Sequence, residues 1–367
     1  MRLKHLGLKE EDEMKILTVV GTRPNFTKEY AMSRALKQKG LHEVLLHTGQ
    51  HYDYEMSQTF FEGLYLPTPK YINQIIKSGF HGDETAAMLM FIEQVLLKER
   101  PDVTLVYGDV NSTVAAALAS VKLHIPVAHV EAGLRCEHFY NPEEINRRVT
   151  DSMSELLFPH IQSAYHSLIQ ENYPPDRIVL PGDIVMDSLL LVARDKQITP
   201  TRGDYHLMTL HRAENTNDPQ KLESIVTAVI ESGARILFLV HPRTKKALVQ
   251  NSLMDRLHKA KNIEVLGPEG FVSFVKLLAG AHKVITDSGG VRREGYIFGK
   301  PVINISDFVW VPEMMAAGWS LLVGADRQRI VQAIHEFEPT GERPPIFGDG
   351  NAAEKIAAAL VHRFGGP

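Results

Sequence analysis

The sequence predicts an α/β protein built from two doubly wound Rossmann-like domains. Short runs rich in β-branched residues alternate with longer stretches of helical spacing, which is the pattern of parallel βαβ units. The alternation occurs in each half of the chain. The length of 367 residues suits two domains at roughly 100 to 200 residues each.

The strands and helices follow from these runs. The predicted strands are 15–20, 43–47, 103–107 and 126–130 in the first half, and 207–210, 236–240, 263–266, 283–286 and 301–305 in the second. Helical spacing occupies 85–99, 110–123, 145–157 and 219–232. Pro174 and Pro175 mark a turn before a boundary near 180–187. We therefore expect domains at 14–182 and 183–350, followed by a last segment at 351–367.

Composition and charge exclude several classes of protein. With 44% hydrophobic and 23% charged residues, 26 Gly and 20 Pro, the chain is neither collagen-like nor of low complexity. Its formal net charge of −4 offers no bulk electrostatic attraction for nucleic acids or anionic membranes. We expect a small-molecule ligand instead.

Cysteine and histidine usage bears on metals and on the cellular compartment. The single Cys136 excludes an internal disulfide framework and a multi-cysteine metal site. The 17 histidines lack compact metal-ligand spacing, so we expect neither a metal nor a cofactor. The charged first 13 residues do not resemble a signal peptide, and no stretch reaches the roughly 18 apolar residues of a membrane span. We expect a cytoplasmic protein, and a homodimer.

Polar side chains gather where the predicted strands end, which is where open parallel sheets bind ligands. In the first half these ends carry Gly21-Thr22-Arg23-Pro24 with Lys28 a turn later, Gly108-Asp109, and Glu131-Ala132-Gly133. In the second half they carry His211-Arg212, His241-Pro242-Arg243 and Asp287-Ser288-Gly289-Gly290. Two such rims facing one cleft between the domains would provide a catalytic site.

The Ser288-Gly289-Gly290 turn is a candidate anion site, because glycines at a helix start let backbone N–H groups approach a phosphate. Arg23 and Arg212 would supply the bidentate donors that a diphosphate favours. The alternatives are an ordinary strand-to-helix turn, and arginines that pair with structural carboxylates.

Several motifs, taken in order, resemble the non-hydrolysing UDP-N-acetylglucosamine 2-epimerases. They are the Gly21–Pro24 segment with Lys28, Thr48-Gly49-Gln50-His51, Gly108-Asp109, HVEAGLR at 129–135, the 142–147 segment with Pro142, Glu143, Glu144, Asn146 and Arg147, His211-Arg212, and TDSGG at 286–290. The resemblance extends from about residue 14 to about residue 326. It implies a glycosyltransferase-B-like pair of Rossmann-like domains, with UDP held mainly by the second domain and a final helix at 352–364 returning to the first.

The chemistry of that family requires acid and base groups on both faces of a sugar. The C2 hydrogen of UDP-GlcNAc is not acidic, because no carbonyl lies next to C2. Removal of this hydrogen while the C1–O bond breaks releases UDP and leaves a 2-acetamidoglucal, to which UDP adds back after protonation on the opposite face. Such a route needs charge stabilisation for the leaving diphosphate.

The resemblance implies the catalytic residues. Asp109 and Glu131 are the expected proton-transfer pair, Glu143 positions the sugar or shares the proton work, His211 assists departure of UDP, and Lys28 lies beside them. Taken alone, Asp109 reads as a helix cap or turn residue. Glu143 and Glu144 also suit the start of a helix at 145–157, so one of them could serve only the helix dipole.

The expected UDP contacts come from the same resemblance. They are Arg23, Arg212, His211, Ser288, Gly289, Gly290 and Glu294, the last through the ribose hydroxyls, with Phe271 beside the uracil. Core packing is an equally good interpretation of Phe271, and His241 is interpreted as structural. Gln50 and His51 suggest a second, regulatory UDP-sugar site, with helix capping by His51 as the alternative.

Some residues depart from the family pattern. Asn25 replaces a common Glu, and VWVPE at 309–313 replaces a TERPE-like segment. Asn25, Phe26 and Trp310 suggest a branch that acts on UDP-2,3-diacetamido-2,3-dideoxyglucuronate, although UDP-GlcNAc is the preferred substrate. Arg292 and Arg293 replace more acidic or amide-bearing residues, and the preferred interpretation is a solvated helix face. A GT-B glycosyltransferase and a non-enzymatic UDP-sugar sensor are the other function classes.

Overall fold

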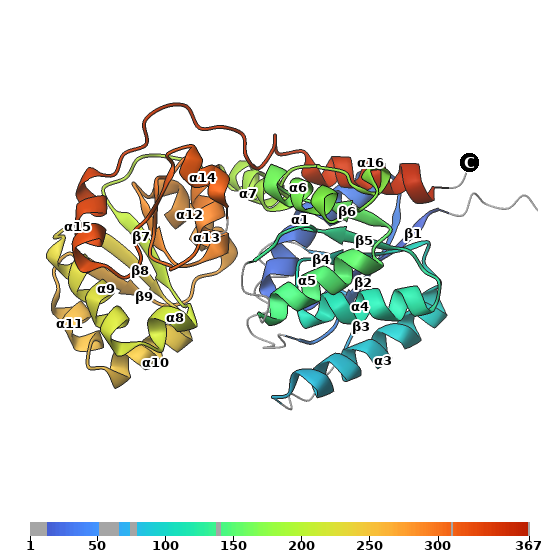
Figure 1. Ribbon diagram of the computed structural model, residues 1–367, viewed down its shortest axis with the longest axis horizontal. Helices are drawn as coiled ribbons and strands as arrows, with labels where there is room; N and C mark the ends of the chain where they lie inside the picture. The colour runs from blue at the N-terminus through green and yellow to red at the C-terminus, as the bar shows by residue number, and fades with distance from the viewer. Residues whose placement is uncertain (1–12, 51–65, 74–78, 137–140, 310, 366–367) are drawn as a thin grey trace, which may run out of the picture. The chain divides into compact units, whose positions relative to one another are not determined.

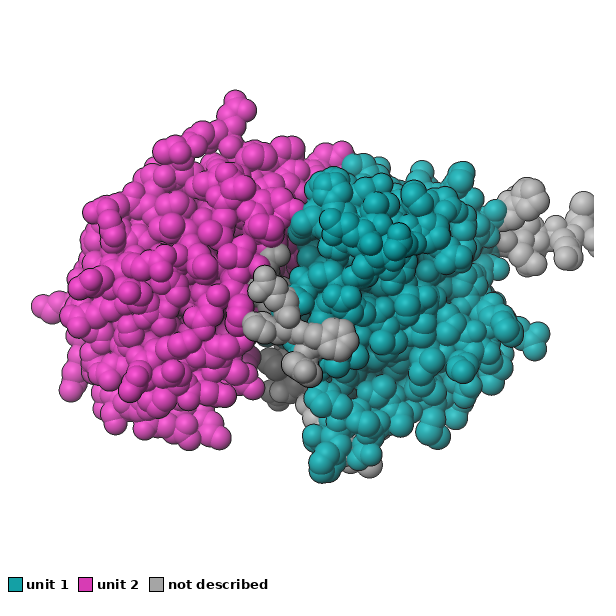
Figure 2. Space-filling model, viewed as in Figure 1, with its two compact units in different colours: residues 1–61, 65–184, 351–367 teal, residues 62–64, 185–350 magenta. Residues whose placement is uncertain are grey.

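The computed structural model describes residues 13–50, 66–73, 79–136, 141–309 and 311–365, and these residues form two compact units. Unit 1 holds residues up to Ile184 together with the last segment from Asn351, and unit 2 holds the residues from Val185 to Gly350 (Figure 2). The prediction of two doubly wound Rossmann-like domains is confirmed by two separate six-stranded parallel sheets.

Unit 1 has strand order β3-β2-β1-β4-β5-β6, the classical doubly wound order. Its strands are β1 (Lys15–Val20), β2 (His42–His47), β3 (Tyr71–Ile72), β4 (Val103–Tyr107), β5 (Val127–Val130) and β6 (Leu156–Phe158). Its helices are α1 (Arg23–Gln38), α3 (His81–Glu99), α4 (Asn111–Lys122), α5 (Pro142–Met153), α6 (Gln162–Gln170) and α16 (Ala352–Phe364), with a short 3-10 helix at Pro175–Arg177.

Two helical layers cover the sheet of unit 1 (Figure 1). Helices α3, α4 and α5 pack side by side, and their apolar faces form one core with β1, β2 and β4. Helix α16 packs against α1 although more than 300 residues separate them in the sequence. Five residues of α16 are buried there: Ala352, Ala353, Ile356, Ala357 and Leu360.

Unit 2 repeats the arrangement with strand order β12-β11-β10-β7-β8-β9. Its strands are β7 (His206–Leu210), β8 (Ile236–Val240), β9 (Ile263–Leu266), β10 (Val284–Thr286), β11 (Val302–Asn304) and β12 (Ser320–Leu322). Its helices are α7 (Ile184–Asp195), which begins at the unit boundary, α8 (Ala213–Thr216), α9 (Pro219–Glu231), α10 (Pro242–Gln250), α11 (Met254–Lys259), α12 (Phe271–Gly280), α13 (Gly289–Ile297), α14 (Pro312–Ala316) and α15 (Arg327–Glu336).

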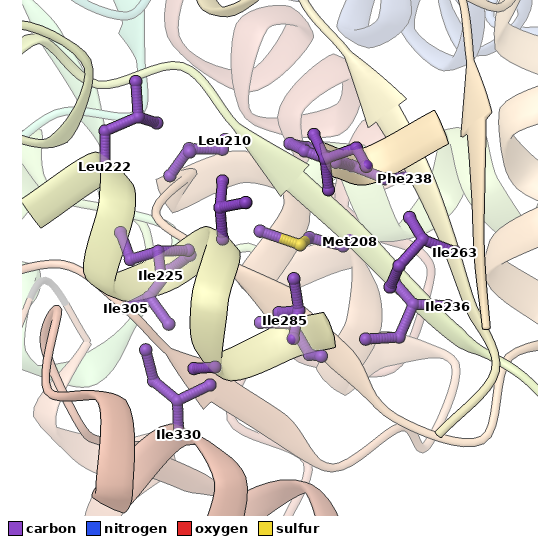
Figure 3. Close-up of a cluster of buried hydrophobic side chains, with 14 of the residues drawn as sticks. Met208, Leu210, Leu222, Ile225, Ile236, Phe238, Ile263, Ile285, Ile305 and Ile330 are labelled. Carbon is purple, nitrogen blue, oxygen red and sulfur yellow. The ribbon is translucent and has the colours of Figure 1, made fainter. Parts of the chain in front are cut away.

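The core of unit 2 forms where the β-branched strands meet α9 and α15. Figure 3 shows side chains from β7, β8 and β10, among them Met208, Phe238 and Ile285, meeting Ile225 of α9 and Ile330 of α15. All five are fully buried. Such strands, apolar on both faces, are typical of parallel sheets covered by helices.

The structure corrects one predicted helix and adds three strands. The helix expected at 145–157 ends at Met153, because the chain turns at Ser154 and Leu156–Phe158 pairs with β5. Strands β3, β6 and β12 have only two or three residues each, which is too short for alternation to be visible. Among the described residues, none of the helices combines the length and apolar character that a bilayer crossing requires.

Candidate active site

Lys28 and Glu131 form a buried ion pair near the point in unit 1 where the strand order reverses. Lys28 lies on α1 and Glu131 directly follows β5, and they are 3% and 8% exposed. Gly108, at the end of β4, has φ 64°, and a Cβ there would lie 3.3 Å from Glu131 Oε2 and 3.5 Å from Lys28 Nζ. A side chain at position 108 would therefore crowd the pair, in addition to the strain of its positive φ.

Glu131 itself has a left-handed backbone, with φ 70°. Its N–H donates to Phe158 O at 3.0 Å, which anchors it against the neighbouring strand β6. A non-glycine residue in this region costs about 1–3 kcal/mol and persists only where the surroundings enforce it. Strain at a strand end that also carries a buried ion pair marks this position as a candidate catalytic one.

Asp109 pairs with a buried arginine and caps no helix. Its Oδ2 accepts from Nη2 of Arg147 on α5, and its carbonyl accepts from Asn146 Nδ2 at 3.0 Å. The N-cap of α4 is Val110. The Asp109 side chain is 31% exposed and Arg147 only 3%. The arginine thus holds in place a carboxylate that a ligand can reach.

The structure separates the two neighbouring glutamates at the start of α5. Glu144 is fully buried and accepts from Arg147, from Arg148 Nε at 2.7 Å and from the backbone N–H of Cys136 at 3.1 Å. Glu143 is exposed in the first turn, where its N–H donates to the cap Asn141. Glu144 is therefore the structural residue, and Glu143 is the accessible one.

A buried network that the sequence reasoning missed supports these residues. His129 Nε2 lies 2.7 Å from Gly108 O, and Nδ1 lies 2.7 Å from Asp151 Oδ1. The ring thereby links the Gly108 turn to Asp151 of α5. Burial raises the pKa of Asp151, but His129 and Arg135 lower it more, and the pKa lies below its ordinary value. His129 thus fixes the Gly108 turn beside Asp109.

The remaining predicted residues of unit 1 lie at two other strand ends. Arg23 is the first residue of α1 and is half-buried. Gln50 Oε1 accepts from the Ser112 N–H at 2.9 Å and the Ser112 hydroxyl at 2.6 Å, which ties the end of β2 to the start of α4. His51 and the proposed regulatory role of its segment lie outside the described residues.

Two residues that suggested a substrate branch have structural roles in this fold. Asn25 Oδ1 accepts from the N–H groups of Gly21 and Thr22, both at 3.1 Å, and completes a capping box for α1. Phe26 is fully buried. Trp310, the third of these residues, lies outside the described residues.

In unit 2, Asp287 organises the turn that carries His211 and Arg212. The fully buried carboxylate accepts from the backbone N–H of Arg212 at 2.9 Å and of His211 at 3.1 Å, and from Asn215 Nδ2 at 3.1 Å. Burial and the charges of Arg212, His241 and Arg243 lower the pKa of His211, although Asp287 raises it. His211 is thereby held largely neutral beside a fixed carboxylate.

The predicted anion turn forms the start of α13. Ser288 is the N-cap, and its Oγ accepts from the Val291 N–H at 3.3 Å. Gly289 and Gly290 occupy the first turn, and Glu294 is half-buried further along the helix. This helix end presents backbone donors and a positive dipole to an anion.

The interpretation of Arg292 as part of a solvated face is wrong, because this side chain is 5% exposed. The segment around Phe308 covers it, since Arg292 Nη1 donates to Phe308 O at 3.1 Å.

Phe271, the first residue of α12, is 7% exposed and thus mostly buried. His241 caps α10, with Nδ1 accepting from the Arg243 N–H at 3.2 Å, in agreement with its structural interpretation. Within the described parts of the chain, no three His, Cys, Asp or Glu residues cluster as metal ligands.

A family model described as UDP-N-acetylglucosamine 2-epimerase matches residues 34–361. The chain belongs to this family. A UDP-2,3-diacetamido-2,3-dideoxy-D-glucuronate 2-epimerase from Pseudomonas aeruginosa is 41% identical over 95% of this chain and 99% of its own length. A UDP-N-acetylglucosamine 2-epimerase from Methanocaldococcus jannaschii is 38% identical over the same shares.

Solved structures of family members have the same fold. The Methanocaldococcus jannaschii enzyme in complex with UDP-GlcNAc and UDP gives a TM-score of 0.85 and covers 95% of this chain and all of its own. The Neisseria meningitidis enzyme bound to UDP-GlcNAc gives 0.86, with 29% identity over the same shares. The predicted family and fold class, a glycosyltransferase-B-like pair of Rossmann-like domains, are thus confirmed, and the chain is a UDP-sugar 2-epimerase, an isomerase.

Proposed function

We propose that this protein interconverts UDP-GlcNAc and UDP-ManNAc by eliminating UDP and adding it back. The observation that carries the proposal is the pair of carboxylates at adjacent strand ends of unit 1, each held by its own cation: Asp109 by Arg147 and Glu131 by Lys28. Family membership and the relatives that act on UDP-GlcNAc support the same substrate.

The two carboxylates differ in access, which suggests how they divide the work. Asp109 is the more exposed of the two carboxylates, and Arg147 holds its side chain in place, so it is the base that takes the C2 proton. The C–H electron pair becomes the C1–C2 double bond, and the C1–O pair leaves with UDP. Glu131 takes a proton from the Lys28 ammonium that it contacts and delivers it to the opposite face of C2 when UDP oxygen attacks C1 again. Glu143 orients the sugar.

Unit 2 supplies groups for the nucleotide. The start of α13 with Ser288, Gly289 and Gly290, together with Arg212, binds the diphosphate, and Glu294 and Phe271 lie toward ribose and uracil. Arg23 is the one proposed diphosphate contact that comes from unit 1. Bond cleavage at C1 adds negative charge to the diphosphate, so donors aimed there stabilise the transition state more than the ground state. His211, held by Asp287, assists departure of UDP.

Incubation with UDP-GlcNAc in deuterium oxide, followed by NMR, tests this function. UDP-ManNAc with deuterium at C2 is expected, because the removed proton exchanges with solvent before the return step. Epimerised product that keeps protium at C2 would count against the route. Free ManNAc plus UDP would indicate hydrolysis, transfer only with an acceptor would indicate a glycosyltransferase, and binding without turnover would indicate a sensor.

UDP-2,3-diacetamido-2,3-dideoxyglucuronate is the second candidate substrate. The relative from Pseudomonas aeruginosa, 41% identical over nearly its full length, favours it. A comparison of kcat/KM for the two UDP-sugars decides between them, because the better substrate reports tighter transition-state binding.

We also propose a cytoplasmic homodimer that supplies a nucleotide sugar for polysaccharide synthesis. The nucleotide sugar as substrate supports the compartment and the pathway class. Support for self-association comes from exposed apolar side chains on the adjacent helices α3, α4 and α5: Met90, Leu97, Leu118, Ile145 and Val149. Light scattering after size-exclusion chromatography tests it, and a mass near 41.1 kDa would refute the dimer.

A further inference from the structure

Arg292 has one guanidinium nitrogen without a hydrogen-bond partner in the described structure. Its Nε lies 3.3 Å from Ser288 O, and its Nη1 lies 3.1 Å from Phe308 O. Its Nη2 is buried and none of the described groups accepts from it. A buried charged donor left unpaired is costly, so this N–H group is available to donate to a bound ligand.

A second guanidinium points to the same place. A Cβ on Gly289 would lie 3.7 Å from Arg292 Nη2 and 3.9 Å from Arg212 Nη2, with no other atom within 4 Å apart from the helix backbone and the adjoining residues. Both arginines thus meet at the first turn of α13, where the helix dipole is also positive. The positive charge is concentrated around one point.

Negative charge from the protein balances this cluster only in part. Among the described residues, Asp287 is the one carboxylate that offsets the charge on Arg292, and it already accepts from the backbone of His211 and Arg212 and from Asn215. Burial, and then the charge of Arg212, lower the pKa of Arg292 to about 10. A bound anion would remove this penalty, and a diphosphate has the charge and the acceptor oxygens to do so.

We infer that Arg292 is a diphosphate-binding residue, which joins Arg212 and the Gly289 N–H in holding UDP as it leaves C1. This inference rests on the proposed function for its ligand. A planar guanidinium donates to two phosphate oxygens at once. Because cleavage of C1–O increases the charge on the diphosphate, Arg292 contributes to the rate as well as to binding.

The position of Val311 suggests that Arg292 replaces an arginine that the family segment carries elsewhere. Val311 stands where the TERPE-like segment has its arginine. Val311, Gly289 and Arg292 border the same cavity, which holds about 10 Å³ and is otherwise walled by side chains such as Met314. An arginine at either 292 or 311 can therefore reach this point, and this chain carries it at 292.

The test compares UDP with uridine, which lacks phosphate, for each variant. Arg292→Gln should weaken UDP binding roughly 10- to 100-fold, as expected for one hydrogen bond to a charged group. Uridine binding, followed by ligand-observed NMR, should not change. Arg293→Gln removes the same charge one residue along and should bind both ligands normally. Equal losses for UDP and uridine, or no loss of UDP, would overturn the inference.

Two further variants keep the test decisive if Arg292→Gln does not fold. Arg292→Lys retains the charge without the planar fork and should bind UDP with intermediate affinity. The double variant Arg292→Gln with Val311→Arg should regain most of the UDP affinity. Unchanged UDP affinity in Arg292→Lys, or no recovery in a folded double variant, would refute the inference. All of these comparisons measure ligand affinity, so they test the role of Arg292 even if the protein does not turn over UDP-GlcNAc.

Discussion

Replacing Asp109 by Asn separates chemistry from stability at the candidate active site. The amide keeps the shape of the side chain but cannot accept the C2 proton as a carboxylate does. General-base catalysis contributes roughly 10² to 10⁴ in rate, which corresponds to about 3–5 kcal/mol of barrier at about 1.4 kcal/mol per tenfold. The stability cost should stay below about 1 kcal/mol, because Asp109 is 31% exposed and Arg147 keeps Glu144 as a partner.

Glu144→Gln is the matched control, since its carboxylate shares Arg147 with Asp109. Glu144 is fully buried and holds three donors, so its loss should cost about 3–5 kcal/mol of unfolding free energy. Turnover per folded molecule should stay nearly normal. Initial epimerisation rates and urea unfolding measure both quantities. If Asp109→Asn lowers the rate less than tenfold, or lowers stability as much as Glu144→Gln does, the proton-transfer role moves to Glu131 or Glu143.

Three other outcomes follow from the sequence and the structure. Burial and nearby cations lower the pKa of His206 to about 4, so the unfolded chain binds a proton at this histidine first, and the free energy of unfolding falls as the pH drops from about 6.5 to 4. His206→Phe should remove up to about 3 kcal/mol of this pH dependence in unfolding titrations; stability–pH curves that run parallel for the variant and the unmodified protein would contradict the assignment. Chelators should not reduce turnover; a loss that a divalent ion restores would show that a metal takes part. His51→Ala should abolish a sigmoidal dependence on UDP-GlcNAc while UDP still binds, and hyperbolic kinetics in the unmodified protein would remove the reason to expect regulation.

The sequence predicted the features of this fold that repeat along the chain. Long β-branched runs such as β1 and β8 (Lys15–Val20 and Ile236–Val240) have the predicted bounds, because burial on both faces leaves a continuous apolar signal. Strands β6 and β12 have three residues each and form mainly because neighbouring strands pair with them. The length of a strand, and not its composition, therefore decided whether it could be predicted from the sequence.

The candidate site was predictable only as far as its residues belong to recognisable motifs. Lys28 and Glu131 were expected in one site, and the structure shows them in contact. The partnership of Asp109 with Arg147, 38 residues away, depends on how α5 packs. The burial of Arg292 had a local signal that was missed. Arg292, Gly295 and Tyr296 are buried three and four residues apart, so they share one face of α13. A glycine and a tyrosine at 295 and 296 indicate that this face points toward the core.

The return of α16 to unit 1 has a consequence for the order in which the chain can fold during synthesis. Residues 185–350 form a continuous segment, so the ribosome releases all of unit 2 before the helix that completes unit 1 has been translated. Until then the surface of α1 that α16 covers stays exposed to water. The unit that begins first is therefore finished last, and a C-terminal truncation would leave unit 1, not the nearer unit 2, incomplete. Protease sensitivity of stalled nascent chains, compared before and after residue 364 emerges, would show this as late protection of the first 184 residues.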